Sequence, residues 1–350
     1  MNETSDSIIL DTAERIFSDL CGPQTVNEAE AGKWPQALWD ALQESGLPLA
    51  SVGEEWGGAG ASRADGFAVL RLAGRFAAPV PLAETLLAGL LLEKARIPVP
   101  PGPLTIAPVV AKGAVAVSPA GLLSGRARRV PFARNAAFIA LLAGRGEERF
   151  VALLPREGIG LSPGTSLAGE PADDLSFDGL AAARLAPSAI EEEALLALGA
   201  ALRVQQIAGA LEGILEQSIS YAGDRTQFGR PIAKFQVIQH NLAMLAGEAA
   251  AASAAAQAAL EACGKERIDV AALAAAKIRA GEAAGTGAAI AHQVHGAMGF
   301  TYEHSLHHRT RRLWAWREEF GNESFWAIRL GQLVAARGAE ALWPTLAADL

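Results

Sequence analysis

The long alanine-rich tract after Pro187 is the feature that most limits what this chain can fold into. Apolar residues recur at helical spacing through Glu191–Asp224, a segment of about eight or nine turns. Alanine dominates two further segments, Gln236–Cys263 and Asp269–Val294. Small side chains let helices approach closely, so these segments predict an antiparallel bundle. A low-complexity linker is the alternative, but the regular Leu, Ile and Met positions favour packed helices.

The residues before this tract have two different textures. Helical periodicity dominates residues 1–104, which end in the proline-rich stretch Ile97–Pro103, and short apolar runs separated by turns follow in 105–187. The expected helices are Asp11–Leu20, Pro35–Ser45 and Arg63–Gly89, and the expected strands lie in Leu104–Val110, Ala114–Val117, Ala137–Ala143 and Arg149–Leu154. The sequence therefore predicts a mainly α protein with a small antiparallel β domain, divided into 1–104, 105–187 and 188–350.

Charge and cysteine content limit the partners and the compartment. The net charge of −8 argues against nucleic acid, because binding to phosphates needs a basic face. Cys21 and Cys263 have no metal or CxxC spacing, which fits a reduced, cytoplasmic protein. The N-terminus lacks the cationic region of a secretory signal, and no uninterrupted apolar run has membrane-spanning length. We expect a soluble protein.

The segment from Arg225 to Gln236 interrupts the helical texture. Arg225 offers a permanent cation, Phe228 a flat apolar face and Gln236 an amide with donors and acceptors. A guanidinium suits a pyrophosphate and an amide suits the edge of a heterocycle, so the set fits a large, flat, anionic cofactor. The alternative is a helix break at Gly229 and Pro231 with ordinary surface residues around it.

A second unusual segment begins at Gln293. A helix is expected to end here, because Gly296 and Gly299 allow tight turns and close backbone approach. Five histidines crowd this region: His292, His295, His304, His307 and His308. They do not form a recognisable metal set with nearby carboxylates, so no metal is expected, and a solvated or subunit-facing cluster is the favoured interpretation.

The third segment, 309–322, combines arginines, tryptophans and carboxylates. Glu318 and Glu319 follow two tryptophans, and a carboxylate beside aromatic rings could act as a base toward a weakly acidic C–H. The alternative, favoured on this segment alone, is a helix with a solvated charged face and its tryptophans in the core.

Taken together, these motifs resemble the acyl-CoA dehydrogenase family over nearly the whole chain. The stretches WDALQESG (39–46), GEEWGGAG (53–60) and LAGEPADDLSFDGL (167–180) are similar to parts of its first two domains. Arg225-x-x-Phe-Gly-x-Pro-Ile-x-x-Phe-Gln236 and Gln293-x-x-Gly-x-x-Gly-Phe300 are similar to its two FAD-contacting motifs. The resemblance implies an N-terminal helical domain, a middle β domain and a C-terminal four-helix bundle.

The resemblance also implies where the cofactor binds. Arg225, Phe228 and Gln236 would hold the FAD of a neighbouring subunit, and Gln293 with the backbone near Gly296 would complete that site. The implied reaction is α,β-dehydrogenation of an acyl-CoA thioester, in which a glutamate removes the α proton and the β hydrogen leaves as hydride to flavin N5. An electron-transfer flavoprotein, or oxygen in some relatives, would reoxidise the flavin.

This chain departs from the family pattern at the base. The usual C-terminal base position falls on Phe320, and the alternative position falls near Gly199. Glu319 is therefore the expected base, Glu318 is the runner-up and Glu248 is a remote third candidate. The family arginine near the alternative position is also absent, with Arg203 the nearest cation. In the short β domain, TIAPVV (105–110) stands where relatives carry a Thr-Glu-Pro-x-x-Gly-Ser-Asp-like loop that wraps flavin and substrate.

Three hypotheses follow from the resemblance. The chain is an FAD-dependent acyl-CoA dehydrogenase, either a homo-oligomer or one subunit of an α2β2 heteromer. Alternatively, it is a non-catalytic partner that contributes Arg225 and Gln293 to a site on another chain, as in heteromeric pairs that act on bulky acyl-CoAs such as steroid side chains. The third possibility is a flavin monooxygenase of the same fold, which would need no α-proton base.

Overall fold

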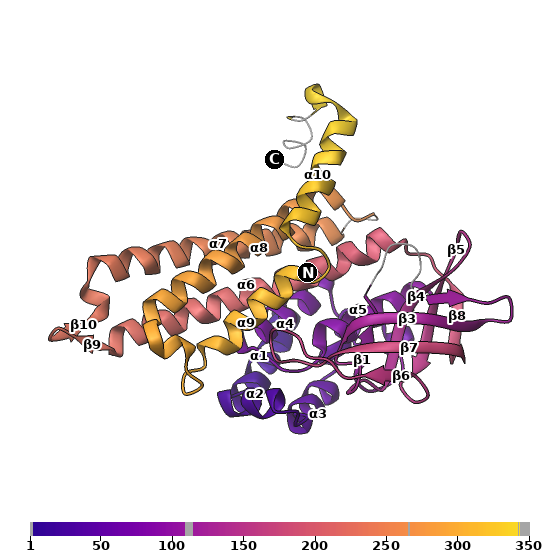
Figure 1. Ribbon diagram of the computed structural model, residues 1–350, viewed down its shortest axis with the longest axis horizontal. Helices are drawn as coiled ribbons and strands as arrows, with labels where there is room; N and C mark the ends of the chain where they lie inside the picture. Colours follow the sequence, from indigo (N-terminus) through magenta and orange to yellow (C-terminus); the bar gives the residue numbers. More distant parts are fainter. Residues whose placement is uncertain (1–2, 109–114, 265–266, 342, 344–350) are drawn as a thin grey trace.

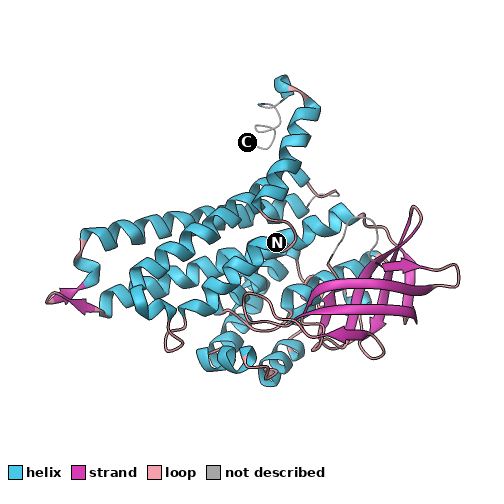
Figure 2. Ribbon diagram, in the orientation of Figure 1, coloured by secondary structure: helices cyan, strands magenta, loops and turns pink. Residues whose placement is uncertain are grey.

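The computed structural model describes residues 3–108, 115–264, 267–341 and 343. Long helices fill one end of the molecule, an eight-stranded sheet lies at the other, and a group of N-terminal helices packs beneath their junction (Figure 1). Figure 2 shows the strands gathered in one body apart from a small hairpin at the far tip of the helices. The predicted fold class, mainly α with a small β domain between two helical parts, is confirmed.

Five α-helices form most of the described N-terminal part. They are α1 (Glu3–Leu20), α2 (Pro23–Glu30), α3 (Gln36–Glu44), α4 (Arg63–Phe76) and α5 (Leu82–Lys94). The prediction of one helix over Arg63–Gly89 was wrong, because the chain turns between α4 and α5. Ala77 ends α4 in a left-handed conformation (φ 53°), and Pro79 and Pro81 lack the N–H that a continuing helix would need. The short helices η1 (Leu47–Leu49) and η2 (Glu54–Trp56) occupy the glycine-rich loop.

The middle part is a single sheet with its own apolar core. Its strands are β1 (Leu104–Ile106), β2 (Val115–Val117), β3 (Leu122–Pro131), β4 (Phe138–Arg145), β5 (Glu148–Pro155), β6 (Gly160–Ser162), β7 (Ala172–Ala181) and β8 (Arg184–Pro187). The path runs β6-β7-β3-β2-β4-β5-β8, with β1 also paired to β4. Most pairs are antiparallel, as expected, but β1 and β2 each run parallel to β4. Residues 109–114, which include the end of TIAPVV, lie outside the described residues.

The C-terminal part is a helical bundle. Its helices are α6 (Glu192–Asp224), α7 (Gln236–Gly264), α8 (Val270–His295), α9 (Leu306–Glu318) and α10 (Glu323–Arg337). Helices α6 to α9 pack together and reverse direction from one to the next (Figure 1). The side chain of Asp269 caps α8 by accepting from the amides of Ala271 and Ala272, both at 3.1 Å. The short helix η4 (Gly296–Phe300) follows α8, and η5 (Ala339–Ala341) follows α10.

Glycines let α4 and α6 touch along their backbones. A Cβ on Gly74 would lie 2.1 Å from the carbonyl oxygen of Gln206, and a Cβ on Gly209 would lie 1.8 Å from that of Arg71. Both distances are far shorter than a van der Waals contact, so neither position accepts a side chain without moving the helices apart. This contact fixes the first domain against the bundle.

Helix α6 is the central element of the molecule. It is the one described helix with the length and apolar composition of a membrane span, but 89% of its most apolar window is buried inside the protein. That burial is typical of a core helix. Its first half faces the junction with α5 and the sheet, while its last residues reach the far tip of the bundle (Figure 1).

Candidate active site

The residues expected to contact flavin lie on the surface at the tip of the bundle. Arg225 ends α6, Phe228 stands at the turn of the hairpin β9 (Thr226–Gln227) and β10 (Arg230–Pro231), and Gln236 begins α7 after η3 (Ile232–Lys234). All three are exposed, and Phe228 is 93% exposed. The hairpin brings them onto one short connection, as the motif predicts.

The guanidinium of Arg225 has no carboxylate within ion-pair distance among the described residues, unlike the Arg203 side chain on the same helix. Gln293 and Gly296 are also exposed, at the end of α8. Tyr221, near the end of α6, stacks on His295 with ring centres 4.4 Å apart, so the end of α8 adjoins the end of α6. An unpaired cation, an exposed ring and two exposed amides suit an anionic ligand that binds at the surface.

A cavity of about 390 Å³ lies at the opposite end of α6, where α5, α6, α9 and the sheet meet. Its lining includes four carboxylates, a buried arginine and a phenylalanine ring, contributed by Glu84, Glu170, Glu318, Glu319, Arg203 and Phe320, and Arg128, Arg129 and Trp314 also line it. None of the five expected flavin contacts lines this cavity. Helix α6 therefore separates two distinct sites.

Arg203 is the centre of the cavity's charge network. Its side chain is 3% exposed and donates from Nε to Glu319 at 2.8 Å, while its other nitrogens donate to Glu84 and Gln206. Burial opposes the charge of Arg203, but the carboxylates of Glu319 and Glu84 outweigh it and raise the pKa. The guanidinium is thus permanently charged and holds both carboxylates.

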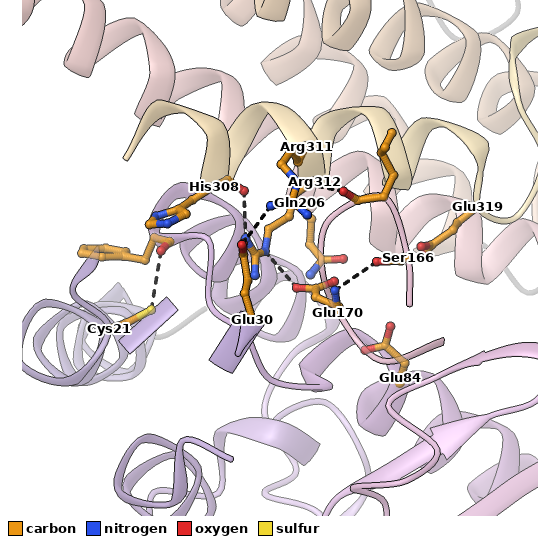
Figure 3. A network of polar contacts seen from close by, with 12 residues as sticks. Cys21, Glu30, Glu84, Ser166, Glu170, Gln206, His308, Arg311, Arg312 and Glu319 are labelled. Atoms are coloured by element: carbon orange, nitrogen blue, oxygen red, sulfur yellow. Dashed lines mark hydrogen bonds and ion pairs between the residues drawn. The ribbon is translucent and has the colours of Figure 1, made fainter. Parts of the chain in front are cut away.

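Glu170 is a further carboxylate in the cavity wall. It accepts from Nε of the fully buried Arg312 at 2.8 Å. Figure 3 shows it with Arg312 on one side and Glu84 and Glu319 on the other. Burial raises the pKa of Glu170, although the Arg312 guanidinium opposes this shift. Glu170 is therefore easier to protonate than an ordinary surface carboxylate.

The prediction of a solvated charged face on α9 was wrong, because its arginines connect the three parts of the molecule. Arg309 donates to the carbonyl oxygen of Arg75 on α4 at 2.7 Å. Arg311 donates to the carbonyl oxygen of Leu167 and to Glu30, both at 2.9 Å. With Arg312 on Glu170, these contacts fix the loop before β7 against α2 and α9 (Figure 3). The same prediction placed the tryptophans of this helix in the core, and this is confirmed for Trp316, which is buried.

The two positions at which a base was expected from the resemblance face each other. A Cβ on Gly199 would lie 2.3 Å from Cδ1 of Phe320, so the phenylalanine ring fills the space beside the glycine. Phe320 has a left-handed backbone (φ 54°), and the guanidinium carbon of Arg203 lies 5.8 Å from its ring centre. The tertiary structure thus brings the two positions together, with Phe320 in the cavity wall, and neither position supplies a carboxylate.

The remaining base candidates differ in their placement. Glu319 and Glu318 both line the cavity, but Glu318 is the more exposed and accepts from Nδ2 of Asn322 at 3.0 Å. Glu248 pairs with Arg279 at 2.6 Å between α7 and α8 and does not line the cavity. Of these three candidates, Glu319 is the one that both lines the cavity and contacts the buried Arg203.

Sequence reasoning missed Glu84 and Glu170 as parts of this site. Glu84 had a detectable signal, because it is an isolated acid in the otherwise apolar start of α5. Glu170 lies inside the quoted stretch 167–180, but its partner Arg312 is 142 positions away in sequence. Only the folded chain brings Glu170 and Arg312 together.

The histidine region is largely buried, so the expectation of a solvated cluster was wrong, and the alternative of a cluster that faces another subunit stays a prediction. His292, His295, His307 and His308 are all buried. Burial lowers the pKa of His295 to about 4 and that of His308 to about 3. His308 shares a hydrogen bond of 2.8 Å with the side-chain oxygen of Asn27. Within the described part of the chain, no group of three or more His, Cys, Asp or Glu side chains could hold a metal ion.

Comparison with known proteins is consistent across both sequence and structure. The acyl-CoA dehydrogenase N-terminal domain model matches residues 4–94, and the C-terminal domain model matches residues 190–324. The chain is 31% identical over 307 residues to the acyl-CoA dehydrogenase IpdE2 of Mycobacterium tuberculosis, covering 86% of this chain and 88% of that protein. It is 26% identical to IpdE2 of Mycolicibacterium smegmatis, over 85% of this chain and 89% of that protein.

Solved structures give the same result. The steroid ACAD Tcur3481–Tcur3483 superposes with a TM-score of 0.87 at 25% identity, over 95% of this chain and 98% of that one. A glutaryl-coenzyme A dehydrogenase in complex with glutaryl-CoA has the same fold, with a TM-score of 0.84 at 20% identity over 95% and 96% of the two chains. The chain therefore belongs to the acyl-CoA dehydrogenase family, whose members are oxidoreductases that act on acyl-CoA.

Proposed function

We propose that the chain is a subunit of an oligomeric, FAD-dependent acyl-CoA dehydrogenase, with its cavity at one subunit contact and its hairpin serving the flavin of a neighbour. The observation that supports this is the separation of the two sites. Arg203 and Arg225 are about 33 Å apart along α6, at about 1.5 Å per residue. A flavin held by the hairpin would therefore be remote from the cavity of the same chain, which supports a hairpin that serves a neighbouring subunit.

The exposed residues of the hairpin fit this role. Arg225 would bind the pyrophosphate, Phe228 would pack against the cofactor, and Gln236 with Gln293 would hydrogen-bond its polar edges. Bound FAD would supply a hydride acceptor for the β hydrogen of the acyl group. Substitution of these residues is expected to lower the flavin content of the assembly without unfolding the chain.

Glu319 is the proposed acceptor of the α proton. It lines the cavity directly before the usual base position, which Phe320 occupies. Its ion pair with Arg203 holds the carboxylate in place beside the cavity. We expect Glu319→Gln to abolish flavin bleaching by acyl-CoA while the FAD content stays unchanged. Full activity in that variant would exclude Glu319 as the base.

A second candidate function is a non-catalytic partner subunit, with the base supplied by another chain. Two observations favour it: Phe320 fills the space beside Gly199, and Arg203 already engages Glu319. The variant Phe320→Glu separates the two functions. If the chain is a partner subunit that lacks a base, the new glutamate should create or restore turnover. If Glu319 already serves as the base, the variant should give no gain in turnover.

The substrate, acceptor and compartment are further parts of the proposal. The steroid ACAD superposes with a higher TM-score and identity than the glutaryl-coenzyme A dehydrogenase does, and this supports a bulky, steroid-derived acyl-CoA over a short one. An electron-transfer flavoprotein is the proposed electron acceptor, and either a homo-oligomer or an α2β2 pair would place the hairpin on a neighbour. The two buried, unpaired cysteines, Cys21 and Cys263, suit a reducing cytoplasm.

The visible spectrum of the chain expressed alone tests the proposal, before and after anaerobic addition of butyryl-, glutaryl- and steroid side-chain acyl-CoA. A flavin spectrum that one thioester bleaches would support a self-sufficient dehydrogenase and identify its substrate class. A colourless chain that gains flavin when co-expressed with a second family member would support the partner-subunit function.

A further inference from the structure

The turn between α9 and α10 carries the proposed base. The backbone reverses at Phe320 (φ 54°) and Gly321 (φ 92°). A left-handed backbone is unfavourable for a residue with a side chain, so contacts from elsewhere have to stabilise this turn. Glu319 directly precedes it. Whatever fixes the end of α9 therefore also fixes the Glu319 carboxylate at the cavity.

Lys277 on α8 makes such a contact. Its side chain is 1% exposed, and Nζ donates to the carbonyl oxygens of Trp316 at 3.2 Å and Arg317 at 2.8 Å. The last carbonyls of a helix have no partners within the helix and carry partial negative charge. A buried ammonium placed between two of them completes the end of α9, two residues before Glu319.

Charged groups from several elements act on this ammonium. Glu323 on α10, Glu319 and Glu318 at the end of α9, and Arg203 on α6 all affect it. Burial lowers the pKa of Lys277 to about 8, although the Glu323 and Glu319 carboxylates oppose the shift. The amine therefore changes charge in a mildly alkaline solution, while most surface lysines do not.

Packing alone does not explain a lysine at this position. Methionine has a similar length and would fill the same space without the cost of removing a charge from water. What lysine adds is a pair of directed hydrogen bonds to the end of α9 and a positive charge among the three carboxylates Glu318, Glu319 and Glu323.

We infer that Lys277 is a positioning residue, whose ammonium fixes the last turn of α9 and thereby holds Glu319 at the cavity. The inference rests on the proposed function, in which Glu319 accepts the α proton. Catalytic groups have to be held closely, because a displacement of about 1 Å can lower a rate about 100-fold. Lys277 itself does not line the cavity.

The variant Lys277→Met in the full assembly tests the inference. We expect kcat to fall about 10- to 100-fold, with KM and FAD content within about twofold of the wild type. Hydrogen exchange at the amides of residues 316–318, in the last turn of α9, should become at least about tenfold faster. Lys277→Gln keeps an amide group that can donate to the α9 carbonyls, so it should give smaller effects. It replaces Lys277→Met in these measurements if Lys277→Met does not fold.

Arg279→Met is the matched control. Arg279 also lies on α8, but it is partly exposed and pairs with Glu248 on α7. Its loss should leave kcat and the exchange of the turn unchanged. In the wild type, exchange at the amides of residues 316–318, corrected for its intrinsic pH dependence, should rise above about pH 8 as Lys277 loses its charge. This rise should be absent in Lys277→Met.

The outcomes separate this inference from the proposed base. If Glu319→Gln abolishes turnover while Lys277→Met changes neither kcat nor exchange, the Lys277 inference is overturned. If Glu319→Gln keeps full activity while Lys277→Met still loosens the turn, the proposed base is wrong and Lys277 remains the residue that holds the turn. An equal loss of kcat in Arg279→Met would also overturn the inference, since the effect would not be specific to the end of α9.

Discussion

The two ends of α6 use the same residue type in opposite ways. Arg203, at the cavity end, is buried and held by Glu84 and Glu319. Arg225, at the hairpin end, is exposed and has no ion-pair partner among the described residues. A buried charge has to be compensated within the fold, whereas an exposed charge remains free to bind a ligand. Burial, rather than residue type, therefore separates the structural Arg203 from Arg225, the arginine proposed to bind FAD.

The largest expected effect is at the buried arginine. Arg203→Met leaves Glu84 buried without its partner, and breaking a buried ion pair in this way costs about 3–5 kcal/mol of unfolding free energy. Urea unfolding measures the loss. The double variant Arg203→Met/Glu84→Gln removes the stranded charge and should recover part of it. A single variant as stable as the wild type would contradict the comparison.

A smaller effect is expected beside Arg203, at the contact of Gly199 with Phe320. Gly199→Ala places a methyl group 2.3 Å from the phenylalanine ring, and overpacking of this kind costs about 1–3 kcal/mol. Phe320→Ala in the same chain should remove most of that cost. Thermal unfolding of the two single variants and the double variant measures the coupling, and additive effects would show that the two residues do not press on each other.

The smallest effect on stability is expected at the hairpin end. Arg225→Met should change the unfolding free energy by less than about 0.5 kcal/mol, because the side chain is exposed and unpaired. The same variant should lower the FAD content of the purified assembly, measured by visible absorbance. Lys234→Met, a cation on the same connection, is the control. If the flavin content of Arg225→Met were unchanged, Arg225 would not bind the cofactor, and the contrast between the two ends of α6 would no longer hold.

Most of the helical architecture was predictable from local sequence. The expected segment Glu191–Asp224 differs from α6 by one residue, and Asp269 was correctly placed at the start of α8, where its side chain caps the helix. Errors arose where local signals were weak or conflicting. The prolines at 79 and 81 split one expected helix into two, and the parallel pairing of β1 with β4 depends on contacts distant in sequence.

The candidate site was predictable only in part. Arg225, Phe228 and Gln236 lie within 12 residues on one connection, so their spacing alone brings them together. The cavity draws Glu84, Glu170, Arg203 and Glu319 from four separate segments. The charged face expected on α9 is instead a set of contacts between domains, because helical periodicity does not reveal which polar residues meet a partner.

The sequence by itself determined most of the helices, the order of the three parts and the exposed hairpin motif, because each depends on residues that are neighbours in the chain. Only the tertiary structure decided that Phe320 covers Gly199, that Arg203 holds Glu319 and that Lys277 completes α9. Even the shortest of these links, from Lys277 to Trp316, joins residues 39 positions apart in the chain. A sequence pattern shows neither how close two such residues lie in the folded chain nor that burial removes water from their contact. Both the short distance and the loss of water make these contacts strong.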